Sequence, residues 1–453
     1  MSTVTSNLRH DALTIFQQGI EAADPYQAVK KCLSITDGSL EIALDLNDSK
    51  PKRKGQWSKV YIIAVGKAAC QMAKAAQEIL SGHIEISKTL AITNYENSIK
   101  IPGIEVLAAG HPIPDEAGVS AAKKLTQLLN NTKHGELVLM LISGGGSALL
   151  CLPAQNISLQ DKQKTTHLLL ASGANIKQIN CIRKHLSQLK GGRLAKLVVP
   201  ADLHSLILSD VIGDELSSIA SGPTVADSST FAQAISILTE KNIWDKIPLA
   251  VQYLLKQGKQ GHIEETPKAN AGCFNLTSHT LIGSNTISLN HCLKTAKDLG
   301  YKTELLSTSL CGEASKIAEQ LALYAKQVEN KLTSQVAIVA GGESTVTIMG
   351  TGLGGRNQEM ALAFAIAAKR YKLKSHWTFL SGGTDGRDGP TDAAGGMVDP
   401  TTLDKLIQGK IDPESFLKNN DSYSALKESQ DLLITGATGT NVADLQILLI
   451  QPK

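Results

Sequence analysis

The sequence has 453 residues, of which 42% are hydrophobic and 4% aromatic. A chain of this length exceeds one ordinary hydrophobic core, so we expect two domains, or three. Lysine and arginine (45) nearly balance aspartate and glutamate (42), and the net charge of +3 argues against nucleic acid or an anionic membrane as a partner. The low aromatic content also leaves few side chains on which nucleic-acid bases could stack.

The distribution of cysteines and apolar residues predicts a cytoplasmic protein. The seven cysteines are scattered and include no CxxC pair, which is typical of buried free thiols in a reducing compartment. Residues 1–16 contain Arg9, His10 and Asp11 and lack the apolar core of a signal peptide. No apolar run approaches the roughly 18 residues that a membrane span requires.

In the first half of the chain, short apolar runs alternate with glycine-rich turns and amphipathic stretches. The pattern predicts strands at 60–65, 89–93, 137–142 and 205–209, and a helix over 68–80. Strands separated by helices form a mostly parallel sheet with helices on both faces, and ligands bind beyond the carboxyl ends of its strands. We therefore predict a Rossmann-like α/β domain over residues 1–250.

The second half of the chain begins with a helical stretch at 235–255 and a polar loop at 257–271, where we place the domain boundary. The apolar runs that follow predict a second α/β set, with a helix over 357–370 and strands at 337–340, 344–349, 377–380, 431–435 and 444–450. We therefore predict a C-terminal α/β domain over residues 251–453.

Two turns of the first domain carry residues that can bind an anion. Lys67 follows a buried strand and opens a helix, where backbone amides attract anions, although a surface lysine at a helix start has the same pattern. The second turn consists of Ser143, Gly144, Gly145, Gly146 and Ser147. Its glycines allow backbone N–H groups to wrap a phosphate, or they form only a tight packing turn.

Neither of two better-known motifs fits this second turn. No Gly-Lys-Ser/Thr follows, so the turn is not a Walker A loop. Leu149 stands where the nucleophile elbow of a serine hydrolase needs a glycine. A phosphate loop and a tight packing turn therefore both remain open for residues 143–147, which are candidates for nucleotide binding.

Two further segments of the first domain carry charge. Four basic residues lie between positions 183 and 193, and we interpret most of them as a solvated face, although they could hold a polyanion. Asp210 follows the strand at 205–209, where a carboxylate can accept a proton or bind Mg²⁺. Asp214, a few residues further on, is a candidate helix cap.

The second domain repeats the arrangement of a strand followed by a glycine-rich loop. Gly341, Gly342 and Glu343 end one strand, and we count them with the phosphate loop as nucleotide-binding candidates. Arg356 opens the next helix and suits a phosphate or carboxylate clamp. Asp385 and Asp388 lie in a glycine-rich loop whose density of carboxylates fits Mg²⁺, although Asx turns in a surface loop are the plain alternative.

Taken together, these motifs resemble the class II glycerate 2-kinase family, whose C-terminal domain is called MOFRL. The matching segments run in order through nearly the whole chain, at residues 64–69, 110–116, 141–148, 179–186, 209–214, 221–224, 341–347, 354–359, 381–386 and 438–441. The resemblance implies a Rossmann-like N-terminal domain, an active site in the cleft between two domains, and ATP and Mg²⁺ as cofactors. It places Lys67, Asp210 and Arg356 among the active-site residues.

The resemblance predicts ATP-dependent phosphorylation of the 2-hydroxyl of D-glycerate by a monomer or homodimer. In that reaction Asp210 would orient or deprotonate the hydroxyl, while Lys67 and Arg356 would neutralise the phosphoryl group or grip the carboxylate. One alternative is an NAD(P)H-dependent hydroxypyruvate reductase, because the glycines at 350, 352 and 355 match GxGxxG. The acidic residue that should end the next strand is absent, which argues against dinucleotide binding. A second alternative is a metabolite-binding protein without activity, but all three active-site residues are present.

Overall fold

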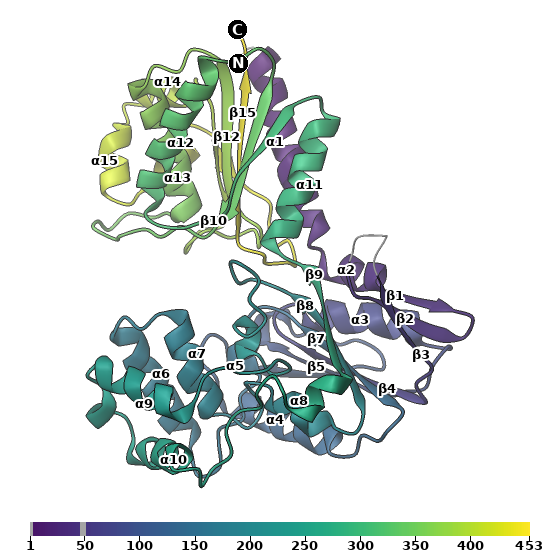
Figure 1. Ribbon diagram of the computed structural model, residues 1–453. Coiled ribbons are helices and arrows are strands. Elements are labelled where there is room, and N and C mark those ends of the chain that lie inside the picture. The colour runs from purple at the N-terminus through teal and green to yellow at the C-terminus, as the bar shows by residue number, and fades with distance from the viewer. Residues whose placement is uncertain (1–2, 46–50) are drawn as a thin grey trace. The chain divides into compact units, whose positions relative to one another are not determined.

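The computed structural model describes residues 3–45 and 51–453 and divides them into two compact units (Figure 1). The first unit contains residues 25–209 and 214–282, and the second unit contains residues 3–24, 210–213 and 283–453. This division differs from the predicted boundary after residue 250. The C-terminal unit also takes in the N-terminal helix, because that helix buries its apolar face in the second unit.

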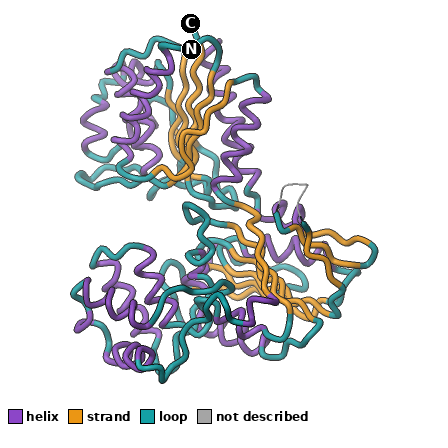
Figure 2. Tube along the Cα trace, in the orientation of Figure 1, coloured by secondary structure: helices purple, strands orange, loops and turns teal. Residues whose placement is uncertain are grey.

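The first unit is built on a six-stranded sheet in the order β6-β5-β4-β7-β8-β9 (Figure 2). The pairs β5–β6, β4–β5, β4–β7 and β7–β8 are all parallel. Its strands are β4 (Lys59–Val65), β5 (Ile86–Asn94), β6 (Glu105–Ala109), β7 (Glu136–Ile142), β8 (Asp202–Leu208) and β9 (Thr277–Gly283). The mostly parallel sheet flanked by helices confirms the predicted fold class.

The strand order of this sheet has a topological switch point between β4 and β7. From β4 the chain builds outward through β5 and β6 on one side, and then returns to place β7 and β8 on the other. The loops that leave β4 and β7 therefore lie at the carboxyl edge of the switch point, which is where ligands bind in such sheets. The turn after β4 contains Lys67, and the loop after β7 is Ser143–Ser147.

Helices and a small sheet surround the central sheet of the first unit. The helices are α2 (Pro25–Cys32), α3 (Ala69–Leu80), α4 (Glu116–Leu129), α5 (Gly146–Leu149), α6 (Leu159–Ala171), α7 (Ile176–His185), α8 (Arg193–Val198), α9 (Phe231–Glu240) and α10 (Leu249–Lys259). Helices α6, α7, α9 and α10 form a lobe with its own apolar core around Phe231 and Leu255 (Figure 1). Strands β1 (Leu33–Thr36), β2 (Ser39–Ala43) and β3 (Lys52–Gly55) form an antiparallel sheet that the sequence did not predict.

The second unit contains a mixed sheet in the order β10-β11-β15-β12-β13-β14. Its strands are β10 (Lys302–Leu310), β11 (Val336–Gly342), β12 (His376–Gly383), β13 (Gly395–Val398), β14 (Leu432–Leu433) and β15 (Asp444–Gln451). The last strand of the chain, β15, lies between β11 and β12 and runs antiparallel to both. This insertion brings the start of β15 beside the ends of β11 and β12.

Helices cover both faces of the second sheet. They are α1 (Thr3–Ala22), α11 (Asn285–Asp298), α12 (Ala314–Glu329), α13 (Arg356–Arg370), α14 (Thr402–Gln408), α15 (Pro413–Lys418) and α16 (Ser422–Glu428). Along β15, Leu445, Ile447 and Leu449 pack toward α1 and α11, whereas Leu448 and Ile450 pack toward α12 and α13 (Figure 1). This alternation is the period of two that a strand buried on both faces shows.

Three predicted elements are wrong. Residues 344–349 alternate like a strand, but they form a loop whose one bridge among the described residues joins Thr345 to Glu313. The helical stretch at 235–255 is two helices, because the chain turns between Glu240 and Leu249. The strand at 431–435 shrinks to Leu432–Leu433 at the edge of the sheet.

Two simpler predictions about the chain can also be compared with the structure. All seven cysteines are free, and six of them are buried, as predicted, whereas Cys311 is exposed. Among the described residues, no helix has both the length and the apolar character needed to cross a membrane.

Candidate active site

The two predicted anion-binding turns of the first unit are in direct contact. The backbone N–H of Lys67 donates to the carbonyl of Gly144 (2.9 Å), and the N–H of Ala68 donates to the hydroxyl of Ser143 (3.1 Å). Both turns follow neighbouring parallel strands, β4 and β7, so the register of the sheet places them side by side. The structure therefore brings Lys67 and the Ser143–Ser147 loop into one site.

Two glycines make this close approach possible. Gly66 has φ +127°, and a Cβ added there would lie 2.1 Å from the hydroxyl oxygen of Ser143. Gly145 has φ +84°, and its Cβ would lie 3.0 Å from the ring of His111 and 3.4 Å from Lys67. An L-residue is disfavoured at both positions, by its backbone conformation and by lack of space.

Polar groups around Lys67 set its electrostatic surroundings. Asn97 donates to the carbonyl of Lys67 (3.1 Å), and Asn94 donates to the carboxylate of Glu96. Burial, and then the positive charge of Lys67, lower the pKa of His111, while Glu96 acts in the opposite direction. The effects of burial and of Lys67 both favour the neutral form of the His111 ring.

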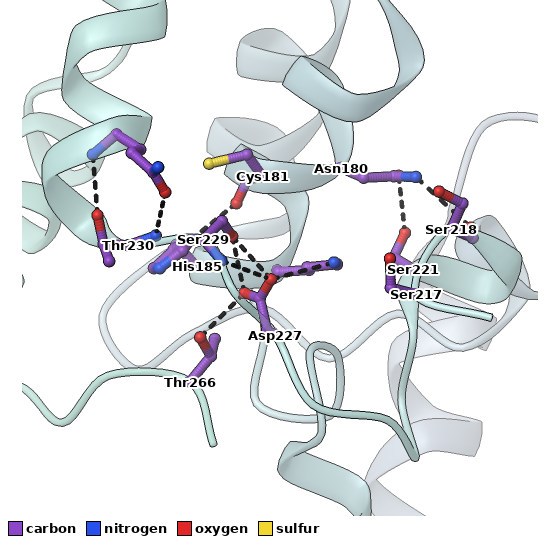
Figure 3. Close-up of polar contacts among 12 residues, drawn as sticks. Asn180, Cys181, His185, Ser217, Ser218, Ser221, Asp227, Ser229, Thr230 and Thr266 are labelled. Atoms are coloured by element: carbon purple, nitrogen blue, oxygen red, sulfur yellow. Dashed lines mark hydrogen bonds and ion pairs between the residues drawn. The ribbon is translucent and has the colours of Figure 1, made fainter. Parts of the chain in front are cut away.

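The hydroxyl of Ser147 begins a short polar chain that leads away from the loop. Ser147 Oγ lies 2.8 Å from Ser221 Oγ, and Ser221 donates to the side-chain carbonyl of Asn180 (3.0 Å). Figure 3 shows Asn180 pointing between Ser218 and Ser221. Neither Asn180 nor Ser221 was predicted as a site residue, although both lie in segments that carry the family resemblance.

In the second unit, Arg356 is held by two carboxylates. Its Nε and Nη2 donate to the two oxygens of Asp444 (2.6 and 2.9 Å), and its Nη1 lies 2.8 Å from Glu343. Burial raises the pKa of Asp444 to about 6 even though Arg356 pulls it downward, because the carboxylate is fully buried. Asp444 was missed by the sequence analysis, since only the insertion of β15 between β11 and β12 places it here.

Asp388 acts as the cap of α13. Its two carboxylate oxygens accept hydrogen bonds from the backbone N–H groups of Asn357 (3.2 Å) and Gln358 (2.8 Å). Burial raises the pKa of Asp388, although these amides and Arg356 lower it. These oxygens satisfy the helix N-terminus, which favours a structural role for Asp388, and its role as a magnesium ligand stays a prediction.

Asp385 remains a candidate magnesium ligand. It is half-buried, and its Oδ1 accepts from the backbone N–H of Arg387 (3.0 Å). A Cβ added at Gly383 would lie 3.3 Å from Asp385 and 3.5 Å from Asp444, so both carboxylates converge there.

This region fits a magnesium ion that is shared with a phosphate. The carboxylates of Asp385 and Asp444 both lie near Gly383, and Asp444 and Glu343 are ion-paired with Arg356. Among residues 3–45 and 51–453, no three acidic, histidine or cysteine side chains form a ready-made metal cage. Mg²⁺ needs only one or two carboxylates when a substrate phosphate completes its shell.

The remaining predicted residues divide between the two units. Gly341 and Gly342 end β11 in the second unit, next to Glu343. Asp210 follows β8, and residues 210–213 group with the second unit. Lys67 and the Ser143–Ser147 loop thus form one set of residues, in the first unit. Asp210, Arg356, Glu343 and Asp385 belong to the second unit.

Residues 350–355, which match the GxGxxG pattern of the reductase alternative, do not form the turn that binds a dinucleotide. Gly350 and Gly352 pack against the backbone of Asn419, so the segment is fixed to the loop between α15 and α16. At Gly355, an added Cβ would lie 2.3 Å from Asp388, whose carboxylate already occupies the N-terminus of α13. A pyrophosphate would need those same amides, so the structure argues against dinucleotide binding at this helix.

The first unit carries a lysine and a glycine-rich loop at the switch point of a parallel sheet, and the second unit carries an arginine held by carboxylates. Both features are typical of α/β proteins that transfer phosphoryl groups. Residues 11–256 match a family described as a domain of unknown function, DUF4147, and residues 336–444 match the MOFRL family. The chain belongs to the glycerate 2-kinase family that carries the MOFRL domain.

Relatives of similar length support this assignment. Glycerate 2-kinase of Pyrococcus horikoshii is 41% identical over 99% of both chains. D-glycerate 2-kinase of Thermotoga maritima is 42% identical over 98% of this chain and 99% of its own. The solved structure of a Thermotoga maritima glycerate kinase covers 98% of this chain, and all of its own, with a TM-score of 0.86. A relative from Agrobacterium vitis, provisionally named a hydroxypyruvate reductase, is 37% identical over 96% of this chain and 93% of its own.

Proposed function

We propose that this protein is a glycerate 2-kinase that transfers the γ-phosphoryl group of ATP to the 2-hydroxyl of D-glycerate. The observation that carries the proposal is the contact between Lys67 and the Ser143–Ser147 loop at the switch point of a parallel sheet. Phosphoryl transfer depends mainly on positioning and charge neutralisation, and this arrangement supplies a glycine-rich loop with a lysine beside it. Full-length similarity to glycerate 2-kinases supports the choice of substrate.

Within this reaction, each set of residues has a separate task. The amides of the Ser143–Ser147 loop bind phosphate oxygens, and Lys67 neutralises the charge that develops on them. Arg356, aligned by Asp444 and Glu343, grips the carboxylate of glycerate or the transferring phosphoryl group. Asp210 orients the 2-hydroxyl and accepts its proton.

One residue of the second unit is the proposed magnesium ligand. Asp385 would hold the ion, and the ion when bound would offset the negative charge of the ATP phosphates. A cytoplasmic location, a monomeric or homodimeric state and the use of Mg²⁺ remain predictions from the sequence.

The test is a coupled assay with the purified protein, D-glycerate, ATP and Mg²⁺. ADP release and a product that enolase consumes are expected, because enolase acts on 2-phosphoglycerate. ADP release with a product that enolase ignores would move the phosphate to another position. No ADP release, together with NADH oxidation on hydroxypyruvate, would replace the kinase by the reductase alternative.

A further inference from the structure

Among the described residues of the first unit, the buried or half-buried cations Lys162, Arg183 and Lys190 form no ion pair with a carboxylate. Lys162 lies in the first turn and a half of α6, Arg183 lies in the last turn of α7, and Lys190 follows α7. Lys162 is 4% exposed and Lys190 is fully buried, while Arg183 is half-buried. The charge of Arg183 acts on both lysines and that of Lys162 acts on Lys190, and none of the three forms an ion pair with a carboxylate of the described residues. We call these residues the cation cluster.

The other buried cations of the same region are paired. Lys184 lies 3.1 Å from Asp227, which also accepts hydrogen bonds from Ser229 and Thr266 (Figure 3). His185 lies 3.1 Å from Glu265, and its hydrogen bonds to Cys181 and to this carboxylate raise its pKa to about 9 against the effect of burial. The basic segment is therefore not the solvated face that the sequence suggested, because Lys184, His185 and Lys190 are buried, and the first two are paired with carboxylates.

The cation cluster lies next to the glycine-rich loop. Lys190 Nζ donates to the carbonyl of Ala220 (3.2 Å), and a Cβ added at Gly146 would lie 2.9 Å from the Cβ of Ala220. Cys151, two residues after α5, is within electrostatic reach of both lysines. Ala220 thus connects the cluster to the loop that begins the candidate active site.

Leaving these cations uncompensated costs the folded protein free energy. Burial lowers the pKa of Lys162, and the Nζ atom of Lys162 has no hydrogen-bond partner among the described residues. Burial and the nearby charges of Lys162 and Arg183 also lower the pKa of Lys190. A buried charge is normally paired, so an unpaired group indicates that a ligand supplies the partner.

We propose that the cation cluster is a subsite for a multiply charged phosphate group, with Arg183 in contact with the ligand and Lys162 and Lys190 behind it. The proposal rests on the proposed function. A guanidinium matches two phosphate oxygens at once, and three cations suit a polyphosphate better than the single charge of a carboxylate. The phosphate belongs either to ATP or to the phosphorylated product, and both sources share this chemistry.

The test compares Arg183→Gln and Lys162→Met with the wild type by isothermal titration calorimetry. Methionine retains the length of lysine without its charge. The matched control is Lys164→Met, which changes an exposed lysine on the same helix. The probes are inorganic tripolyphosphate, ATP and 2-phosphoglycerate.

Both cluster variants are expected to bind tripolyphosphate about 10- to 100-fold more weakly than the wild type, because each loses one charge-assisted contact. Lys164→Met should bind it unchanged. A parallel loss for ATP with normal binding of 2-phosphoglycerate assigns the subsite to the nucleotide, and the reverse assigns it to the product. Wild-type affinity for all three probes in both variants would overturn the proposal.

Thermal unfolding distinguishes a ligand-binding role of Lys162 from a purely structural one. Without ligand, Lys162→Met should melt at or above the wild-type temperature, because an unpaired buried charge is removed. The rise in melting temperature that tripolyphosphate produces should shrink in the variant. A variant that melts lower and keeps the full rise would contradict the proposal. ADP formation by the wild type tests the proposed function separately.

Discussion

Replacing Glu359 by glutamine should stabilise the protein at alkaline pH. Glu359 lies in the first turn of α13 and is 5% exposed, and its carboxylate accepts a hydrogen bond from Asn420 (3.2 Å). Burial raises its pKa from 4.5 to about 7, with smaller contributions from the charges of Glu313 and Asp388. Glutamine retains the shape and can still accept the hydrogen bond from Asn420.

The magnitude follows from the difference between folded and unfolded pKa values. The folded protein holds the proton of Glu359 up to about pH 7, whereas the unfolded chain releases it near pH 4.5. The wild type therefore loses stability as pH rises through this window, by about 3 kcal/mol in total. Glutamine has no proton to lose, so its advantage should be small below pH 4.5 and about 3 kcal/mol at pH 8.

Urea unfolding between pH 5 and pH 8 measures this difference. The fluorescence of Trp377, which is buried against Phe364 in the second unit, reports on the relevant core. Glu329→Gln is the control of opposite sign. Hydrogen bonds from Lys326 and nearby amides outweigh burial and lower the pKa of Glu329 to about 2, so its loss should destabilise the protein at pH 8. A Glu359→Gln effect that does not change with pH would refute the reasoning.

Three further predictions concern the candidate site and its support. Lys67→Met and Arg356→Met should each lower kcat about 100-fold or more with unchanged circular dichroism, and near-normal turnover in either would remove that residue from the mechanism. Asp385→Asn should raise the Mg²⁺ concentration needed for half-maximal activity. Asp388→Ala should instead lower the free energy of unfolding by about 1–2 kcal/mol. If Asp388→Ala changed the Mg²⁺ requirement and Asp385→Asn changed the stability, Asp388 would be the magnesium ligand and Asp385 the structural residue. Asp227→Asn should cost about 3–5 kcal/mol in a denaturant titration by leaving its buried lysine partner unpaired, and a loss under 1 kcal/mol would contradict that pairing.

The parts of the site that depend on local sequence were predictable. Lys67 and the Ser143–Ser147 loop each follow an apolar strand within a few residues, so the strand-turn-helix pattern reveals them. The sequence also indicated that Arg356 opens a helix. These positions are set by short-range rules, namely strand period, glycine content and helix start.

The parts that depend on distant segments were not predictable. Asp444 reaches Arg356 only because the last strand is inserted between β11 and β12. Asp388 looked like a metal ligand, since nothing in its own loop shows that the N-terminus of α13 lies beside it. The helix α1 joins the second unit through Leu8, Ile15 and Phe16, whose apolar spacing predicts a buried face but does not identify its partner.

The burial of the basic segment shows the same limitation. The spacing of Arg183, Lys184 and Lys190 suits an exposed basic face. Their burial follows from contacts with segments that lie more than twenty residues away, such as Ala220 and Asp227. The sequence of one segment therefore predicts where the charges lie along the chain. Which charged side chains are buried without an ionic partner depends on the tertiary contacts.

The central claim, that phosphate is attached to the 2-hydroxyl of glycerate, is tested most directly by ³¹P NMR of the reaction product. The purified protein is incubated with D-glycerate, ATP and Mg²⁺, and the proton-coupled spectrum is recorded. A phosphorus attached at carbon 2 couples to one neighbouring proton and gives a doublet, which is the predicted result. A triplet would place the phosphate on the 3-hydroxyl, and the absence of a new phosphoester signal would contradict the kinase assignment itself.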